Sequence, residues 1–396
     1  MYEKTHKAVR TLHSMKDALQ YHATHRGKIG TKILTSITND KELSLAYTPG
    51  VASPCKEIAR HPAHAYQYTM KGRTVAVVTD GSAVLGLGDI GPLASLPVME
   101  GKAALFKALA DLDAFPLAID ERDEQAFIDT VERIAPSFGA INLEDIASPK
   151  CFLIEQELKK RLDIPVFHDD QHGTAVVVYA ALTNALTLRK TSLDTARIVI
   201  NGAGAAGIAI AKLLHAQGAV HVTVLDSKGV LSTDRTLPPH KQEISELTQG
   251  RSGTLAQAIV DADVFIGASV GGVLRAQDVE QMKPDAIVFA LANPDPEILP
   301  EKALAAGAKY VATGRSDFPN QINNVLVFPG MMKGAIMAQA TAITHEMQVA
   351  AAKAIAGSVE PTTNQLLPKA LDTTVAESVS KAVAKTARTQ GLTRAT

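Results

Sequence analysis

A glycine-rich turn between a strand-like and a helix-like segment constrains the fold of this chain more than any other feature. Residues 196–201, Ala-Arg-Ile-Val-Ile-Asn, have the β-branched character of a buried strand, and residues 205–217 have helical spacing. Residues 202–207 between them match the fingerprint G-x-G-x-x-G, and a second strand-like segment, 221–226, ends in an acid. This order of elements predicts a Rossmann-type dinucleotide-binding domain, whereas a glycine turn that binds nothing needs neither the strand nor the acid.

Each part of the fingerprint has a physical role in holding a dinucleotide. The first glycine permits a tight turn, the second lets backbone amides approach a pyrophosphate, and the third allows close helix–strand packing. Asp226 would accept hydrogen bonds from the ribose hydroxyls and repel a 2′-phosphate, which favours NAD. Ser227 and Lys228 follow directly and would accept that phosphate, so NADP stays an alternative. The residues predicted from this pattern to bind the cofactor are Gly202, Ala203, Gly204, Ala205, Gly207 and Asp226.

Length and composition narrow the class of protein. At 396 residues the chain is too long for one compact core, and 46% hydrophobic and 20% charged residues argue against disorder. The formal net charge of −1 provides no basic excess for nucleic acid, and Cys55 and Cys151 are too few for a disulfide scaffold. The first residues do not resemble a signal peptide, and no apolar run is long enough to span a membrane. We therefore expect a cytoplasmic protein that binds neither nucleic acid nor membranes.

Alternating strand-like and helix-like segments precede the fingerprint as well as follow it. The pattern predicts strands at 74–80 and 115–120 around a helix at 97–111, which is typical of a parallel sheet covered by helices. A long alanine-rich helix at 173–188 then leads into the dinucleotide-binding series, so we place a domain boundary near residue 170. The remaining predictions are strands at 264–268, 286–291 and 310–313, helices at 334–355 and 374–388, and helical spacing from Val9 to Leu19.

A second match to the fingerprint, Gly86–Gly91, lacks the flanking elements. Pro92 and Pro97 follow it and disfavour an immediate helix, and the next strand-terminal acid is Asp120, far beyond the usual spacing. We therefore interpret this segment as a loop of the substrate domain rather than as a nucleotide site.

Two acidic motifs follow strand-like segments of the N-terminal half. Residues 142–145, Asn-Leu-Glu-Asp, come after the apolar run 138–141, and residues 167–172, Phe-His-Asp-Asp-Gln-His, end the run 164–167. Ends of parallel strands meet at one edge of a sheet, and three carboxylates there would repel one another unless a cation neutralised them. Oxygen ligands suit Mg²⁺ or Mn²⁺. The two histidines leave zinc open, and acids that cap helices or lie in solvent are the structural alternative.

A lysine and a tyrosine are further candidates whose sequence context is ambiguous. Lys102 lies in the mostly apolar helical segment 98–107, and Tyr47 lies in a turn-like segment, 45–52, with apolar flanks. A surface lysine and a packing tyrosine are the simpler interpretations of the two residues taken alone.

Seven segments taken together resemble the malic enzymes, in their shorter bacterial form. The similarity extends from about residue 18 to residue 390. The segments that carry it are Ser44–Ala52, Val84–Gly91, Met99–Lys102, Asn142–Asp145, His168–Ala175, Ala292–Pro294 and Asp317–Gly330.

The resemblance implies a role for each candidate residue. It implies an acid (Tyr47), a base (Lys102), three ligands of Mg²⁺ or Mn²⁺ (Glu144, Asp145 and Asp170), a residue beside the metal (Asp169), and two residues that contact malate or the nicotinamide (Asn293 and Asn324). The larger eukaryotic forms carry an arginine where this chain has Ala83, so the malate carboxylate needs another partner, for which Arg315 or the asparagines are candidates.

The implied fold is α/β with two domains. Residues 1–170 would form an α/β substrate and metal domain, and residues 171–396 a Rossmann-type NAD(P)-binding domain with extra C-terminal helices. The implied assembly is a homodimer or a larger homo-oligomer, in which the N-terminal helices and the Tyr47 loop reach a neighbouring subunit.

The implied reaction is the oxidative decarboxylation of L-malate to pyruvate. Lys102 would remove the hydroxyl proton, which requires its pKa to fall from about 10.4 through partial burial and a neighbouring cation, and Tyr47 would protonate C3. A metal-dependent oxaloacetate decarboxylase is the main alternative, because decarboxylation is half of the same reaction. A non-catalytic nicotinamide sensor is disfavoured because the catalytic set is intact.

Overall fold

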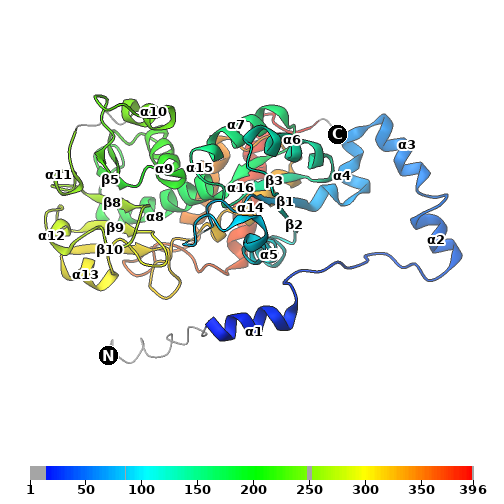
Figure 1. The fold of residues 1–396 in the computed structure, drawn as a ribbon, viewed down its shortest axis with the longest axis horizontal. Helices are drawn as coiled ribbons and strands as arrows, with labels where there is room; N and C mark the ends of the chain where they lie inside the picture. The colour runs from blue at the N-terminus through cyan, green and yellow to red at the C-terminus, as the bar shows by residue number, and fades with distance from the viewer. Residues whose placement is uncertain (1–14, 85, 248–251, 395–396) are drawn as a thin grey trace.

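The computed structural model describes residues 15–84, 86–247 and 252–394 and contains two parallel sheets. The first sheet has the strand order β2-β1-β3-β4, and every neighbouring pair in it is parallel. Its labelled strands lie to the right of the second sheet in Figure 1. Its order reverses between β1 and β3, which makes the carboxyl ends of these two strands a topological switch point. Its strands are β1 (Thr74–Thr79), β2 (Asp113–Ala118), β3 (Ala140–Leu143) and β4 (Val166–His168).

Helices connect the strands of the first sheet. They are α5 (Gly91–Ala110), α6 (Glu124–Ile134) and α7 (Lys150–Arg161). The prediction that two prolines prevent a helix after the Gly86–Gly91 loop is wrong, because α5 begins at Gly91. Pro92 lies in the first turn, where a missing N–H costs nothing, and Pro97 is accommodated inside the helix. The short helical turns are η1 (Pro62–His64), η2 (Met70–Arg73), η3 (Ala135–Ser137), the π-turn η4 (Asp169–Gly173) and η5 (Asn324–Leu326).

The second sheet has the order β10-β9-β8-β5-β6-β7 and is parallel except for its edge strand β7. Its order reverses at β5, the strand that precedes the glycine fingerprint, as in doubly wound nucleotide-binding sheets. The predicted strands are confirmed, and the two-residue β7 was not foreseen. The strands are β5 (Arg197–Asn201), β6 (His221–Asp226), β7 (Gly229–Val230), β8 (Val264–Gly267), β9 (Ala286–Ala290) and β10 (Ala308–Thr313). The helices are α9 (Ala205–Ala216), α10 (Pro239–Leu247), α11 (Leu255–Ala258), α12 (Ala276–Val279) and α13 (Pro300–Ala305).

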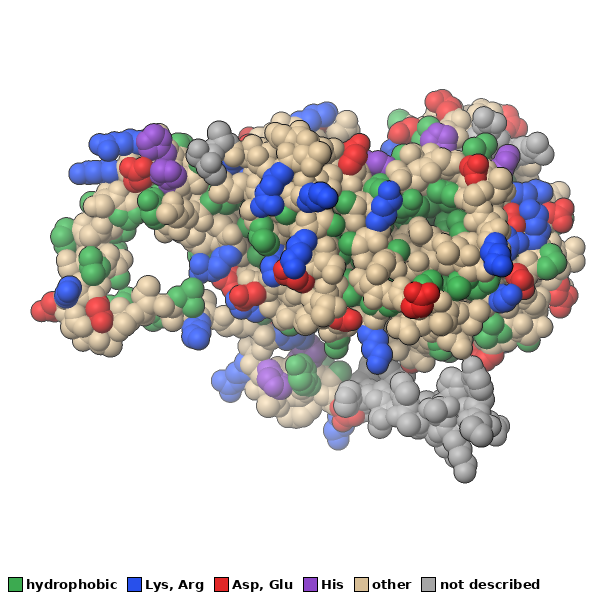
Figure 2. All heavy atoms as spheres, turned by 180° about the vertical axis from the view of Figure 1, so that it is seen from behind, with side chains coloured by type: hydrophobic (Ala, Val, Ile, Leu, Met, Phe, Trp, Pro, Cys, Tyr) green, Lys and Arg blue, Asp and Glu red, His purple; other side chains and the backbone are tan. Residues whose placement is uncertain are grey.

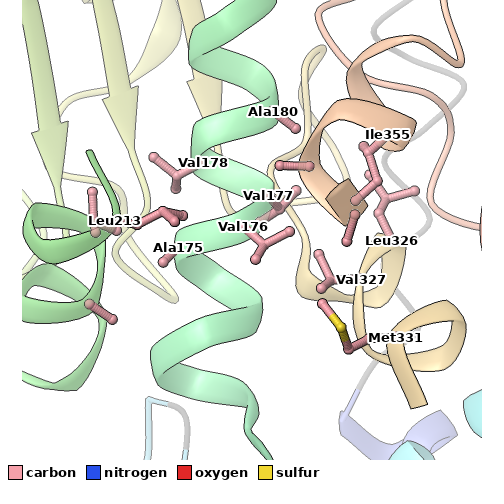
Figure 3. Packing of buried hydrophobic residues seen from close by; sticks show 14 of the residues in the cluster. Ala175, Val176, Val177, Val178, Ala180, Leu213, Leu326, Val327, Met331 and Ile355 are labelled. Atoms are coloured by element: carbon pink, nitrogen blue, oxygen red, sulfur yellow. The ribbon is translucent and has the colours of Figure 1, made fainter. Parts of the chain in front are cut away.

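Helix α8 (Thr174–Arg189) joins the two sheets into one hydrophobic core. Its apolar side chains point in opposite directions: Ala175 and Val178 lie toward Leu213 of α9, whereas Val176 and Val177 lie toward the C-terminal helices (Figure 3). A helix that is apolar all round is a buried helix, and α8 fits that description. The same cluster includes residues of both sheets, so the two sheets share one core on the faces toward α8, while each sheet has a smaller hydrophobic cluster of its own on its other face.

Three C-terminal helices cover the side of α8 that faces away from α9. They are α14 (Phe328–Met337), α15 (His345–Ala356) and α16 (Thr373–Thr389). The prediction of one helix from 334 to 355 is wrong. The chain leaves α14 through Gln339, whose φ is 49°, and Thr344 then caps α15 by accepting a hydrogen bond from the backbone N–H of Met347.

Residues 15–60, called the N-terminal arm below, extend away from the two sheets (Figures 1 and 2). The arm contains α1 (Met15–His25), α2 (Asp40–Ala46) and α3 (Ala52–Arg60), and α4 (Ala65–Tyr68) follows where the chain returns. Val9 and Leu12, part of the predicted N-terminal helix, lie outside the described residues. No helix in the described part of the chain is long and apolar enough to cross a bilayer.

Helices α14 and α16 pack so closely that a glycine is required at their crossing. A Cβ atom on Gly334 would lie 2.5 Å from the carbonyl oxygen of Ser380 and 2.8 Å from Cβ of Val383. We predict that Gly334→Ala lowers the free energy of unfolding by roughly 1–3 kcal/mol through overpacking, measured by thermal or urea unfolding. The matched control is Gly101→Ala, another helical glycine, whose Cβ would meet no atom within 4 Å. Equal loss of stability in both variants would contradict the packing argument.

Candidate functional site

The acidic motifs lie at the carboxyl edge of the first sheet, around its switch point. Glu144 and Asp145 directly follow β3, and Asp169 and Asp170 directly follow β4. The backbone N–H of Ala83, after β1, donates to the carbonyl oxygen of Asp145 at 2.9 Å, which ties the β1 and β3 loops together. The three loops therefore converge at one place, as the sequence predicts.

Glu144, Asp145 and Asp170 form a carboxylate cluster. One oxygen of each lies within 4.8 Å of the others, and Glu144 and Asp145 are buried. Asp145 has a φ of 54°, and its backbone N–H donates to Oδ2 of Asp170 at 2.8 Å. Burial raises the pKa of Glu144 and the pKa of Asp170, and their mutual repulsion adds to the shift for Glu144. This is the trio predicted to hold a divalent cation, and the cluster contains no histidine.

Lys102 points from α5 into this acidic edge. Its Nζ lies 2.5 Å from Oδ2 of Asp169 and 2.8 Å from Oε1 of Glu144, and the side chain is only 8% exposed. The ammonium also lies 4.0 Å from the centroid of the Phe328 ring, close enough for a cation–π interaction. The simpler interpretation of Lys102 as a surface lysine is therefore wrong.

The pKa of Lys102 does not fall as we expected from burial. Burial lowers it, but the charges and hydrogen bonds of Asp169 and Glu144 outweigh burial, so the pKa of Lys102 is raised overall. The lysine is a firmly held ammonium in this arrangement. Any change that removes negative charge from its two partners shifts the balance toward the neutral amine.

Asp169 occupies the first position of the π-turn η4. Its side chain is fully buried, and burial raises its pKa to about 8 despite the ion pair with Lys102. Oδ2 accepts from Lys102, whereas Oδ1 has no hydrogen-bond partner. A Cβ on Gly173 would collide with that oxygen, so a glycine is needed for the turn to close over the carboxylate. The turn therefore holds a buried carboxylate against Lys102, which also contacts Glu144 of the acid cluster.

A buried glutamate from α7 accepts hydrogen bonds from residues in and beside the turn η4. Glu155 accepts hydrogen bonds from the backbone N–H of His168 at 3.3 Å and from Nε2 of His172 at 2.9 Å, and it pairs with Lys159 at 2.7 Å. Burial raises the pKa of Glu155, but His172 and Lys159 outweigh burial and lower it overall. His172 therefore supports the turn through its ring, whereas both ring nitrogens of the buried His168 have no hydrogen-bond partner, and neither histidine belongs to the cluster of three carboxylates.

The fingerprint forms the expected turn after β5. Gly202 has a φ of 132°, and its N–H donates to the carbonyl oxygen of Leu225 at 2.9 Å, which places the turn beside the end of β6. A Cβ on Gly207 would collide with the carbonyl oxygen of Gly202, so the third glycine is required for close packing. Gly204 precedes the first residue of α9, where unpaired N–H groups favour a phosphate.

Asp226 lies at the end of β6, beside the fingerprint, but its carboxylate is already engaged. Nη2 of Arg235 donates to both of its oxygens at 3.0 and 2.9 Å, and Nζ of Lys241 donates to Oδ2 at 3.1 Å. Burial raises the pKa of Asp226, but these donors and the backbone N–H of Lys228 lower it to about 2. The acid is therefore an anion held by two cations, which the sequence pattern did not indicate.

The two sites adjoin one another. Ala205, at the start of α9, packs against the hydrophobic cluster that β1 and β3 form with α6 and α7. Helix α9 also contacts the turn η4, which carries Asp169. A Cβ on Gly86 would lie 3.6 Å from the carbonyl oxygen of Asn293, and a Cβ on Gly173 would lie 3.3 Å from Cβ of Asn324. Asn293 therefore lies against the loop that contains Gly86, and Asn324, the first residue of η5, lies against the turn η4 that carries Asp169.

Comparisons with known proteins agree with this arrangement. The family described as malic enzyme, N-terminal domain, matches residues 26–159, and the family described as malic enzyme, NAD binding domain, matches residues 171–388. The chain belongs to the malic enzyme family. The predictions of this family and of its two-domain α/β fold are confirmed, whereas the boundary at residue 170 stays a prediction.

Individual relatives are similar over nearly the whole chain. The bifunctional malic/malolactic enzyme of Bacillus subtilis is 52% identical over 388 residues, which cover 96% of this chain and 95% of the relative. The NAD-dependent malic enzyme of Geobacillus stearothermophilus is 50% identical over 93% of this chain and 78% of the relative. The crystal structure of an NAD-dependent malic enzyme from Thermotoga maritima superimposes with a TM-score of 0.91 at 49% identity, covering 93% of this chain and 99% of that one.

Two candidate residues lie outside the acidic cluster. Tyr47 follows α2 on the N-terminal arm and is 69% exposed. Arg315 pairs with Asp317 at 2.7 Å and donates to the carbonyl oxygen of Pro294, the residue after Asn293, at 2.9 Å. Arg315 and the asparagines all stay candidates for the contact with the malate carboxylate.

Several residues that shape the site were not singled out from sequence. They are Phe328 beneath Lys102, Asn142, which donates to Glu144 at 2.8 Å, Glu155, and the pair Arg235 and Lys241. Asn142 was within reach of sequence reasoning, because it belongs to an acidic motif at a strand end. Phe328 lies in the segment Asp317–Gly330 that carries the resemblance, but its place beside Lys102 is a tertiary contact; Glu155, Arg235 and Lys241 lie within about 15 residues of their partners in segments that no motif marks.

His168 provides a pH-dependent test of the turn. Burial lowers its pKa to about 4, whereas the unfolded chain has an ordinary value of about 6.5. Because the unfolded chain binds the proton more tightly, the folded protein loses roughly 3 kcal/mol of stability from this group as the pH falls through that window. We predict that His168→Leu, which cannot take up a proton, flattens the pH dependence of urea unfolding of chelator-treated protein between pH 6.5 and 4. Parallel curves for wild type and variant would show that the imidazole is not buried in its neutral form.

Proposed function

We propose that this chain catalyses the oxidative decarboxylation of L-malate to pyruvate and carbon dioxide with NAD(P) and a divalent cation. The observation that carries the proposal is the buried Lys102, held between Glu144 and Asp169 beside a cluster of three carboxylates. The proposal places substrate and metal chemistry in residues 1–170 and cofactor binding in residues 171–396.

The carboxylate cluster fits Mg²⁺ or Mn²⁺. Burial and mutual repulsion oppose the ionisation of Glu144, and the buried Oδ1 of Asp169 has no hydrogen-bond partner. A bound Mg²⁺ or Mn²⁺ would offset the repulsion at Glu144 and would give Oδ1 of Asp169 a positively charged neighbour. We assign Glu144, Asp145 and Asp170 as its ligands and Asp169 as the residue beside it. When bound, the cation supplies a Lewis acid for the C2 oxygen of malate and for the charge left when carbon dioxide departs, and the nicotinamide accepts the hydride from C2.

Lys102 is the base in this proposal. Its Nζ faces the acidic edge, where the C2 hydroxyl of malate would lie. The ring of Phe328 lies against the ammonium and shields it from water on that side. Neutralising Glu144 and Asp169 removes the influences that raise the lysine pKa and leaves burial, which lowers it. Asn293 and Asn324 would then orient the malate carboxylates or the nicotinamide amide by hydrogen bonds.

The proposed acid, Tyr47, is supplied by a second copy of the chain. Helices α2 and α3 bury no residue, and the arm exposes many large apolar side chains. Those side chains are Leu19, Tyr21, Ile29, Ile33, Leu34, Ile37, Leu43, Leu45, Tyr47 and Val51. An apolar surface of this size on an extended segment favours a partner, and an arm exchanged between two identical subunits is a low-cost route to a dimer.

The first test combines substrate and metal. With malate, NAD⁺ and Mg²⁺ or Mn²⁺, we expect formation of reduced nicotinamide and pyruvate, and chelator should abolish it. We also expect Mn²⁺ to raise the melting temperature of wild type but not of Asp170→Asn, because the variant loses one ligand. Oxaloacetate decarboxylation without malate oxidation would identify the alternative, a lyase. Full malate turnover in chelator would contradict the metal assignment.

The second test asks whether each active site contains residues from two copies of the chain. Lys102→Ala and Tyr47→Phe should each lose activity by orders of magnitude, while NAD binding by Lys102→Ala stays intact. If Tyr47 reaches the partner's site, co-expressed variants form mixed dimers with one intact site, so activity should recover to about a quarter of wild type. Two different Lys102 variants, Lys102→Ala and Lys102→Met, mixed together provide the control and should not recover. No recovery in the first mixture would place Tyr47 elsewhere.

A further inference from the structure

A fully buried glutamate at the carboxyl edge of the second sheet has no role in the reaction proposed above. Glu297 is 0% exposed and lies in residues 291–299, the loop that follows β9. Its Oε1 accepts a hydrogen bond from the backbone N–H of Ser269 at 3.0 Å, and its Oε2 accepts one from the backbone N–H of Ala292 at 3.0 Å. Ser269 lies in residues 268–275, the loop that follows β8. One carboxylate therefore joins the β8 loop to the β9 loop.

Both of these donors are neutral, which makes this carboxylate costly to bury. Burial raises the pKa of Glu297, and the backbone N–H groups offset burial only in part. Asp263, a buried carboxylate at the amino edge of the same sheet, is instead paired with Arg189 and Lys283. A glutamine of the same shape as Glu297 would offer one acceptor oxygen and turn its NH₂ group toward the second N–H. A carboxylate is therefore the side chain that can accept from both loops at once.

The β8 strand is shaped to make room for this glutamate. A Cβ on Gly267, the last residue of β8, would lie 2.3 Å from Cδ of Glu297, so any larger residue would displace the carboxylate. The backbone N–H of Leu274 also donates to the carbonyl oxygen of Glu297 at 3.1 Å. The β8 loop thus contacts both the side chain and the backbone of the glutamate.

The β8 loop in turn lies against the glycine fingerprint. A Cβ on Gly202 would lie 2.2 Å from the carbonyl oxygen of Ala268. Nδ2 of Asn201, the residue before the fingerprint, donates to Oγ of Ser269 at 2.9 Å. A shift of the β8 loop would therefore change its position relative to the turn predicted to bind the pyrophosphate.

The β9 loop carries the other end of this connection. Ala292 is followed directly by Asn293, the residue proposed to contact malate or the nicotinamide. In a doubly wound sheet the dinucleotide lies across the switch point, with one half on each side of it. The adenosine half belongs to the side of β6, where Asp226 lies, so the nicotinamide half belongs to the side of β8 and β9. Glu297 therefore joins the two loops on the nicotinamide side.

We propose that Glu297 is a positioning residue for the nicotinamide end of the cofactor: its carboxylate fixes the β9 loop, and with it Asn293, against the β8 loop before the cofactor binds. This inference rests on the proposed dinucleotide-dependent reaction. Loops that are already ordered lose less conformational freedom on binding. Hydride transfer also requires the nicotinamide and C2 of malate to be held in close register.

The decisive experiment compares the cofactor with its adenosine half by isothermal titration. The ligands are the preferred cofactor, NAD⁺ or NADP⁺, and the matching fragment, 5′-AMP or adenosine 2′,5′-bisphosphate. Glu297→Gln should bind the cofactor about 5-fold more weakly than wild type or worse, and the fragment within about 2-fold of wild type, because only the nicotinamide side loses a hydrogen bond. Equal weakening of both ligands, or no weakening of either, would overturn the proposal.

Kinetics provide a second readout. At saturating cofactor, Glu297→Gln should lower kcat for malate oxidation about 10-fold or more, because a misplaced nicotinamide slows hydride transfer even when it is bound. Asp263→Asn is the matched control, since it also removes a buried carboxylate from this sheet, but at the opposite edge. The control should lose stability and keep its kcat. Equal losses of kcat in the two variants would contradict a positioning role.

Hydrogen exchange of the wild type without cofactor tests the inference even if Glu297→Gln does not fold. The amides of Ser269 and Ala292 should exchange as slowly as interior amides of β8 and β9, because their acceptor is buried. Exchange as fast as that of an unstructured loop would show that the two loops are not held before the cofactor binds, and would overturn the proposal.

Failure of this inference is distinguishable from failure of the proposed reaction. Malate oxidation by wild type, with an unchanged kcat in Glu297→Gln, would remove only the positioning role. Absence of malate oxidation by wild type would remove the proposed reaction. In that case, weaker binding of the cofactor by Glu297→Gln with unchanged binding of the adenosine fragment would still support the positioning role.

Discussion

Burial of one lysine among carboxylates is the interaction on which the arrangement of this protein depends. Charges are rarely buried unless they are paired, because leaving water costs several kcal/mol per ion. Lys102 meets that condition through Asp169 and Glu144, which come from two different strands of one sheet. The pairing requires the carboxyl ends of β3 and β4 to lie beside the middle of α5, so the charge balance of the site depends on how the helix packs on the sheet.

The shared core explains how a metal-binding edge and a nucleotide-binding edge become neighbours. Helix α8 begins directly after the turn that carries Asp169 and is buried between α9 and the C-terminal helices (Figure 3). Packing of α8 thus sets the distance between the acid cluster and the fingerprint. Because α8 follows η4 directly and packs on α9, a movement of α8 would displace the acid cluster and the fingerprint together.

Local sequence patterns were sufficient for the strands other than β7 and for the grouping of the acids, whereas several short helices were not predicted. Glu144, Asp145 and Asp170 directly follow strand-like segments, which is a local feature of the chain, and their predicted grouping is confirmed. The sequence pattern gave wrong helix boundaries where the local sequence is compatible with more than one backbone conformation. It placed a single helix across 334–355, although the backbone turns at Gln339, and it took Pro92 and Pro97 to prevent a helix directly after the Gly86–Gly91 loop, although α5 begins at Gly91.

The amino-acid sequence alone was enough for the fold class, the fingerprint and the acids, because periodicity, glycine spacing and strand-end residues are local properties of a chain, and the family followed from the seven segments that resemble malic enzymes. Only the tertiary structure decided what each charged group has as its partner. It gave Asp226 two cations, Lys102 an aromatic neighbour and a raised pKa, and Tyr47 an exposed position on the N-terminal arm. The physical reason is that electrostatic interactions depend on distance and burial in space, and neither is encoded in the separation of residues along the sequence.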